Sequence, residues 1–222
     1  MLRPKKKLHK KEIKEDALVT RYFQARRFYD QNSRMVNTVL IVVLALAVIG
    51  VFMARSRRIE ELKAQSALGD ALQSLYMNDP GTLIRKMDEV TKKFSGTPAA
   101  GEAAFFAANA LFETGDLKEA DRRFAMVMDG HGGNPVFRAS SLAGRAAIAE
   151  SEKRWQDAAR LYTQAAEKYP DLFTAPFYLK EAARCQLEAG DRKSARAVLE
   201  TIEKRFPESQ VSQETEWMKL SM

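Results

Sequence analysis

The side chains that most often catalyse reactions or hold metal ions are few in this 222-residue chain and lie far apart. There are two histidines, His9 and His131, and one cysteine, Cys185. A catalytic triad or a zinc site needs several such groups together, and a disulfide needs a second cysteine. The run 130–133 (GHGG) lacks the Gly-Lys-Ser/Thr ending of a phosphate-binding loop. We therefore predict no enzyme, no cofactor and no metal site, and we expect Cys185 to be a small packing residue.

One apolar run, residues 36–54, is the only stretch long enough to span a bilayer. It reads VNTVLIVVLALAVIGVFMA, carries no charge, and makes 20 residues with Met35. Such a helix is about 30 Å long, which is the thickness of a hydrocarbon core. Its Val, Ile, Leu and Phe side chains favour insertion by about 4–7 kcal/mol in total. A buried helix of a soluble domain is the alternative, but no nearby segment offers cover on all sides. We expect a transmembrane signal anchor over residues 35–54.

The charges beside the run predict its orientation. Residues 1–34 hold eleven Lys/Arg and four Asp/Glu, whereas three arginines follow the run before the first acid. Because positive residues stay in the cytoplasm, we expect the N-terminus inside and residues 55–222 in the periplasm of an inner-membrane protein. A cleavable signal is the competing interpretation, but its small-x-small triplet, residues 45–47, lies in mid-run. The topology signal is carried by Lys5, Lys6, Lys7, Lys10, Lys11, Arg26, Arg27 and Arg34.

The net charge of +7 belongs entirely to the N-terminal tail. Residues 55–222 hold 25 basic and 25 acidic residues, so their composition indicates no nucleic-acid partner. The tail interleaves its bases with aromatic residues, a pattern that suits contact with anionic lipid. Contact of the tail with the ribosome, nucleic acid or a translocon is the alternative.

Beyond residue 55 the sequence is typical of helices that recur with a period of about 37 residues. Turn residues interrupt Ala-, Leu-, Glu- and Lys-rich segments about every 14–20 residues. Three positions repeat four times: Leu83, Ala120, Ala158 and Ala195; Met87, Phe124, Tyr162 and Leu199; and Val90, Val127, Ala165 and Ile202. Within each unit they lie at i, i+4 and i+7, which is one face of a helix. The chain is predicted to be all-α, with a transmembrane helix followed by an α-solenoid of helix pairs.

The expected organisation has five parts. They are a basic cytoplasmic tail (1–34), the anchor (35–54), a connecting helix (55–79), the repeats (80–208) and a C-terminal helix or tail (209–222).

The repeats resemble the tetratricopeptide family. The segments ETGDLKEADRRF, KRWQDAARLYTQAAEKYP and EAGDRKSARAVLETIEKRFP show its pattern of a Gly-Asp pair, a small residue, an aromatic or large residue one turn later, and a closing Pro. Two departures occur in the middle unit: Lys153-Arg154 replaces the Gly-Asp pair, and Arg145 stands where an aliphatic residue is usual. They weaken its motif without breaking its apolar stripe.

The whole layout resembles the YfgM-like ancillary subunits of the Sec translocon. The resemblance implies a membrane-anchored interaction protein whose partners are the translocon, a periplasmic chaperone or secreted clients. The alternative is a scaffold or assembly factor of another envelope complex, in division, outer-membrane assembly, respiration or photosynthesis. The sequence predicts no oligomeric state.

In arrays of this type the first helix of each pair lines the inner face. On that basis the partner-binding residues are expected to be Phe105, Asn109, Phe112, Phe177, Lys180 and Arg184. Apolar side chains beside a few charges suit an extended or helical peptide segment. The alternative is that the phenylalanines are packed between helices.

Overall fold

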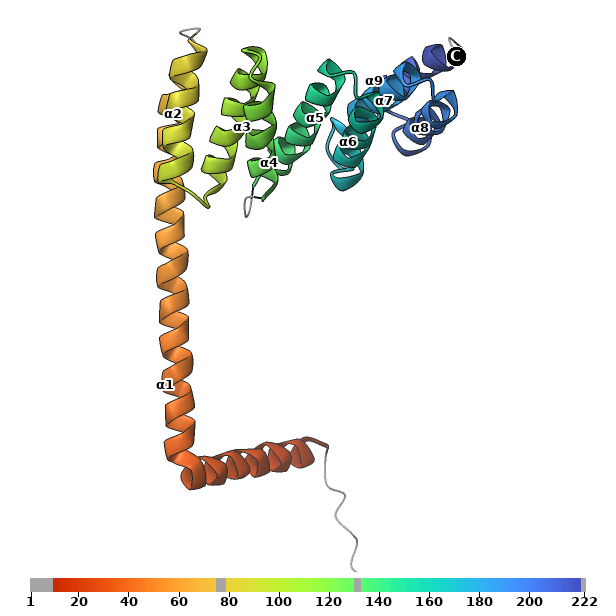
Figure 1. Ribbon diagram of the computed structural model, residues 1–222. Helices are drawn as coiled ribbons and strands as arrows, with labels where there is room; N and C mark the ends of the chain where they lie inside the picture. Colours follow the sequence, from red (N-terminus) through yellow and green to blue (C-terminus); the bar gives the residue numbers. More distant parts are fainter. Residues whose placement is uncertain (1–9, 75–78, 130–132, 221–222) are drawn as a thin grey trace, which may run out of the picture. The chain divides into compact units, whose positions relative to one another are not determined.

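The computed structural model describes residues 10–74, 79–129 and 133–220, with side chains from residue 19 onward apart from that of Asp129. Lys5, Lys6, Lys7, His9 and His131 lie outside the described residues, and of Lys10 and Lys11 only the backbone is described. Within these ranges the chain is all-α and has nine helices (Figure 1): α1 Lys10–Leu72, α2 Pro80–Lys93, α3 Pro98–Glu113, α4 Leu117–Asp129, α5 Pro135–Ser151, α6 Trp155–Lys168, α7 Ala175–Glu188, α8 Arg192–Arg205 and α9 Gln210–Leu220. The predicted fold class is confirmed.

The chain divides into two units, residues 1–56 and 57–222. In the first unit, α1 is interrupted at Asn32, where φ is −123° and ψ is 24°. The Asn32 amide donates to the carbonyl oxygen of Phe28 at 3.1 Å, a local bond that competes with regular helix geometry. Among the described helices, only α1 has a segment that is long and apolar enough to cross a membrane. None of that apolar segment is buried inside the structure. A core helix of a soluble protein is mostly buried, so this helix is consistent with a single membrane anchor.

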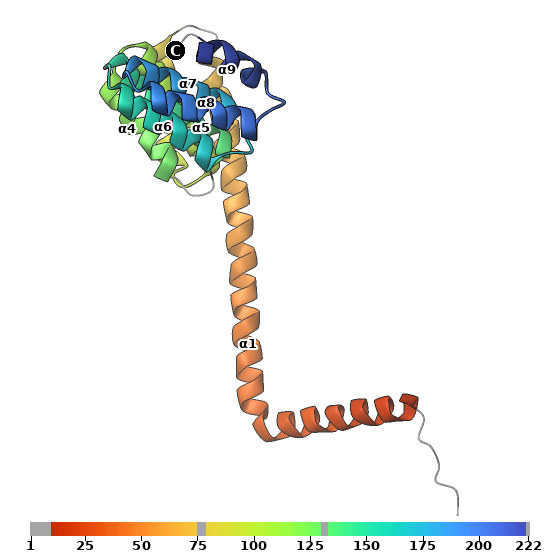
Figure 2. The same cartoon turned by 90° about the vertical axis from the view of Figure 1, so that its right-hand side faces the viewer.

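The second unit is a row of antiparallel helix pairs. The end of α1 packs with α2 through a shared apolar cluster. The pairs α3–α4, α5–α6 and α7–α8 follow, with α9 against α7 and α8. Figure 2 shows this unit from the end at which α8 and α9 lie. Its apolar clusters each join consecutive helices; one, for example, unites Ala64 of α1 with Met87 of α2 and Ala103 of α3. This is the neighbour-to-neighbour packing of a repeat array.

The repeated apolar stripe forms the contact between helices in every unit. All twelve predicted positions are buried, and the most exposed of them, Tyr162, shows only 8% of its surface. The second repeat adds a close approach: the ring of Phe124 lies against Gly144 of α5 and fills the space that a Cβ at that position would need. The prediction that these residues share one helix face in each unit is confirmed.

The turns that join the two helices of a pair share one backbone conformation. Gly115 and Gly190 have φ of +87° and +80°, and the amides that follow them bond back to the last turn of α3 and of α7. Lys153 takes the same left-handed conformation with φ of +58°. The amide of Arg154 then reaches the carbonyl of Ala149 at 2.8 Å. The middle unit therefore keeps the helix ending of its neighbours although it lacks their glycine.

Candidate functional site

The first predicted set of contact residues lies on α3 and is largely occupied by packing. The Phe105 ring centroid lies 5.1 Å from that of Phe137 and 6.0 Å from that of Phe124. Phe112 packs against the same apolar cluster, which joins α3, α4 and α5. The Asn109 amide donates to the Phe105 carbonyl at 3.1 Å. These side chains stand between helices and leave little free surface for a ligand.

The second set lies on α7, beyond the α5–α6 pair, so the two sets are separate. Phe177 is 41% exposed, and the Lys180 ammonium lies 5.9 Å from its ring centroid. Lys180 also contacts a carboxylate oxygen of Glu214, on α9, at 2.8 Å. Phe177 is thus the member of this set with an open face, and Phe173, which precedes α7, is 78% exposed.

Arg184 belongs to a charged cluster that ties α7 to α5. Its guanidinium donates to Glu150 at 2.6 Å and to Glu181 at 2.7 Å. Burial acts to raise the pKa of Glu150, but the bonds from Arg184 and Cys185 outweigh it, and the pKa of Glu150 is lowered. We infer that Arg184 holds neighbouring helices together through this cluster.

Cys185 is buried inside that cluster. Its thiol donates to Glu150 at 3.2 Å, and burial, together with this bond and the negative charge of Glu150, raises the pKa of Cys185 to about 12. A thiol held so firmly in its neutral form is a poor nucleophile. Its complete burial confirms the prediction that it is a small packing residue.

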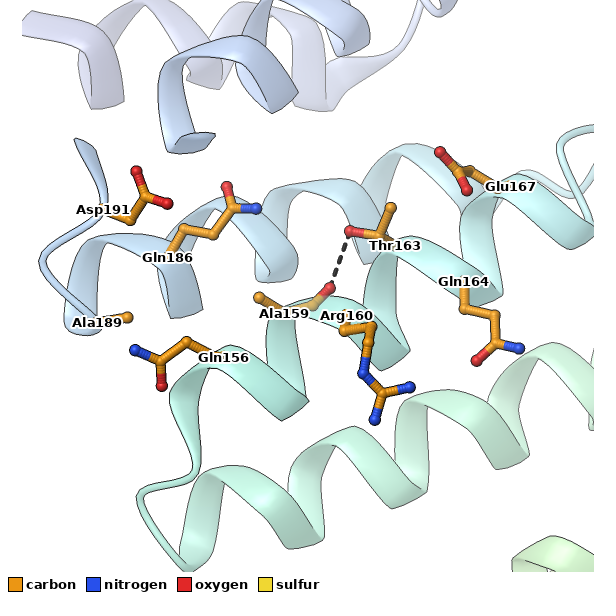
Figure 3. Close-up of a pocket in the computed structure, with 9 residues that line it drawn as sticks. All are labelled: Gln156, Ala159, Arg160, Thr163, Gln164, Glu167, Gln186, Ala189 and Asp191. Atoms are coloured by element: carbon orange, nitrogen blue, oxygen red, sulfur yellow. Dashed lines mark hydrogen bonds between the residues drawn. The ribbon is translucent and has the colours of Figure 1, made fainter. Parts of the chain in front are cut away.

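A polar groove on α6 and the α7–α8 connection was not predicted from the sequence. Its volume is about 490 Å³, and its lining residues are Gln156, Ala159, Arg160, Thr163, Gln164, Glu167, Gln186, Ala189 and Asp191. Figure 3 shows the three glutamine amides around the groove, and the Thr163 hydroxyl donating to the Ala159 carbonyl at 2.8 Å.

The glutamine amides of this groove are not engaged by other side chains. Gln156, Gln164 and Gln186 make no side-chain hydrogen bond within the described residues, and the oxygen of Gln186 is buried without a partner. Each amide carries donors and an acceptor, as a peptide main chain does. In the sequence, only a polar stripe on the outer face of α6 could indicate this groove. Any solvated helix face gives the same pattern, so the stripe does not predict a binding site.

In the ranges 19–74, 79–129 and 133–220, no three His, Cys, Asp or Glu residues are grouped so that they could hold a metal ion.

Comparison with known proteins agrees with this picture. A family model described as tetratricopeptide repeat-like domain matches residues 26–142, slightly more than half of the chain, and one described as tetratricopeptide repeat matches residues 149–213. Both describe repeat scaffolds, which are typically not enzymes. No curated protein is significantly similar in sequence.

Solved structures share the fold at low identity. The crystal structure of MamA protein is 12% identical, with a TM-score of 0.52 over 64% of this chain and 72% of that one. A MamA RS-1 ArsTM double mutant is 14% identical, with a TM-score of 0.53 over 72% of this chain and 84% of that one. At such identities the likeness shows the fold alone. On the family match, the chain belongs to the tetratricopeptide repeat-like domain family, whose repeats are protein-interaction modules.

Proposed function

We propose that this protein is an ancillary subunit of the Sec translocon, anchored in the bacterial inner membrane by residues 35–54. Its repeat array would then contact a periplasmic chaperone or emerging clients. The observation that carries the proposal is the layout of the chain. A basic tail and an unburied apolar helix precede the repeats, and the family match begins at residue 26, so it covers the apolar segment together with the first repeats.

The two units suit different contacts. Only the segment 1–54 can reach both the cytoplasmic mouth and the lipid-facing side of a membrane channel. Residues 55–222 have equal numbers of acidic and basic residues, so the array has no excess positive charge with which to hold anionic lipid. We assign channel contact to the anchor and partner contact to the array.

Of the six residues predicted for partner contact, Phe177 is the one that we place at the centre of the partner surface, because its side chain is exposed. In the array, Lys180 and Arg184 are held by Glu214 and Glu150, so their role is to position α7 rather than to meet a ligand charge. An exposed aromatic beside paired charges suits the apolar side chains of an unfolded or extended segment. The glutamine-lined groove on α6 is a separate surface, because its residue Gln186 lies nine residues from Phe177 and about 180° around α7. Its amides can form hydrogen bonds with a peptide main chain.

Site-specific photocrosslinking of the full chain in living cells tests this proposal. Crosslinkers at Thr38 and Leu46 are expected to capture a Sec channel subunit or its membrane-bound chaperone partner. Crosslinkers at Phe177 and Gln164 are expected to capture secreted polypeptides or a periplasmic domain. The matched control is Lys118, an exposed position of α4 outside the proposed surface, which should capture neither.

Capture of a different envelope complex by Thr38 and Leu46 would replace the translocon assignment with the scaffold alternative. The repeat fold would survive that result.

A further inference from the structure

The helical segment ahead of the kink carries an aromatic and basic surface that no other described segment covers. Tyr22, Phe23, Phe28 and Tyr29 are between 44% and 60% exposed, and Arg21, Arg26 and Arg27 lie among them. Exposed aromatics on a helix that leads directly into an apolar span are the composition of a segment that lies at a membrane surface.

Helix geometry sorts these side chains into faces. Tyr22, Ala25 and Tyr29 lie at i, i+3 and i+7 and so form one stripe. Arg21 and Arg26 stand about 70° to either side of it, Phe28 lies about 90° away, and Phe23 and Arg27 lie toward the opposite face. The stripe is therefore aromatic at its centre and positively charged at both edges.

One hydrogen bond shows which way this stripe faces. The Tyr29 hydroxyl lies 3.2 Å from the Asn37 side-chain oxygen and donates to it, across the kink at Asn32 (Figure 1). Asn37 lies in the first turn of the apolar run. A side chain that reaches the span across the bend lies on the inner side of that bend, which is the side on which the span enters the bilayer. Tyr22 and Ala25, which share the face of Tyr29, then point toward the same leaflet.

The charge distribution indicates that the surface that would cover the stripe is anionic. Residues 1–34 carry the whole net charge of +7, and residues 55–222 are neutral. Anionic headgroups attract juxtamembrane bases, and tyrosine prefers the headgroup level of a bilayer. Lipid is also the one surface that an inserted span is certain to bring beside this helix.

We propose that residues 19–31 form an interfacial helix that binds anionic phospholipid, with Tyr22, Ala25 and Tyr29 facing the bilayer and Arg21 and Arg26 contacting headgroups. The kink at Asn32 is the point at which the chain turns from the membrane surface into the membrane. This assignment rests on the anchoring by residues 35–54 that belongs to the proposed function, but not on the identity of any protein partner.

The test uses the full chain in nanodiscs of phosphatidylcholine, with and without phosphatidylglycerol. An environment-sensitive fluorophore is attached to Tyr22→Cys, to the control Gln24→Cys, whose side chain lies about 130° from the stripe, or to Leu46→Cys within the span. Cys185 remains in place, because its buried thiol, with a pKa of about 12, does not compete for the label. Quenching by nitroxide-labelled lipid reports which positions touch the bilayer.

We expect the label at position 22 to be quenched, with blue-shifted emission, in phosphatidylglycerol discs, and the label at position 24 to stay in water. Replacing Arg21 and Arg26 by Gln should shift the bound-to-free equilibrium of position 22 toward water by roughly fivefold per arginine.

Several outcomes would overturn the proposal. Equal quenching at positions 22 and 24 would contradict the assignment of Tyr22 to the bilayer-facing side of the helix. Equal quenching at position 22 with and without phosphatidylglycerol would contradict the proposed contact with anionic headgroups. Protection of position 22 that appears only when a protein or RNA is added assigns the surface to that partner. A quenched label at position 46 with position 22 in water overturns this proposal alone, whereas an unquenched label at position 46 overturns the membrane anchor as well.

Discussion

At the scale of single residues, Lys153 shows how one unit keeps the shape of its neighbours with a different amino acid. Its φ of +58° is a conformation in which glycine has no steric penalty and other residues do. The sequence shows the missing glycine plainly. It does not show that the chain would keep the left-handed turn, because the turn is enforced by the packing of α5 against α6 and not by the residue itself.

We predict that Lys153→Gly raises the free energy of unfolding of residues 57–222 by about 1 kcal/mol, because it removes the left-handed strain. The converse control, Gly190→Lys, should lower it by about the same amount. Urea unfolding followed by circular dichroism measures both. If the Lys153→Gly variant were less stable, the lysine side chain would contribute more to the free energy of unfolding than its left-handed backbone conformation costs.

The ionisation of the Glu119 carboxyl group is expected to make the free energy of unfolding depend on pH. Its hydrogen bonds to Arg122 and Arg123 lower the pKa of Glu119 from 4.5 to about 2 in the folded chain. A lowered folded-state pKa contributes stability that is present above the unfolded pKa and is lost as pH falls toward the folded one. Unfolding curves of residues 57–222 between pH 6 and about 2 should therefore show decreasing stability.

The Glu119→Gln variant should show a shallower pH dependence than the parent chain, while Glu188→Gln, an exposed position of α7, should keep the parent slope. Identical slopes for all three would contradict the role assigned to Glu119.

At the scale of elements, the sequence predicts the repeat helices well because their stripe is periodic and apolar. Small residues such as Ala120 and large ones such as Phe124 recur at fixed spacing, and burial follows from that spacing. The kink at Asn32 and the groove on α6 are not predictable in this way. The first depends on one local side-chain bond, and the second is made of polar residues that look like any solvated face.

We predict that Ala158→Trp destabilises the array while Glu167→Ala does not. Ala158 is completely buried, so a larger side chain would overpack a helix pair at a cost of about 1–3 kcal/mol or more. Glu167 is exposed, and its replacement should change stability by less than about 0.5 kcal/mol. Equal melting temperatures for the two variants would refute the assigned helix faces.

At the scale of the whole molecule, the net charge and the exposed apolar surface lie in different segments of the chain. The tail carries the net positive charge, the next segment carries the unburied apolar surface, and the array is neutral. Composition makes this division visible. The candidate contact residues are harder to predict, because Lys180 and Arg184 pair with Glu214 and Glu150. Those partners lie 34 residues away in the chain, so no local pattern indicates the pairing.

The central claim is that one membrane span holds the repeat array outside the cytoplasm. Reporter fusion after Met222 of the full chain tests it most directly. Because the basic residues before the span outnumber those that follow it at once, the N-terminus should stay inside. An alkaline phosphatase fused there should be active, and a reporter that works only in the cytoplasm should be silent. The reverse pattern would contradict the topology and, with it, the proposed role in protein secretion.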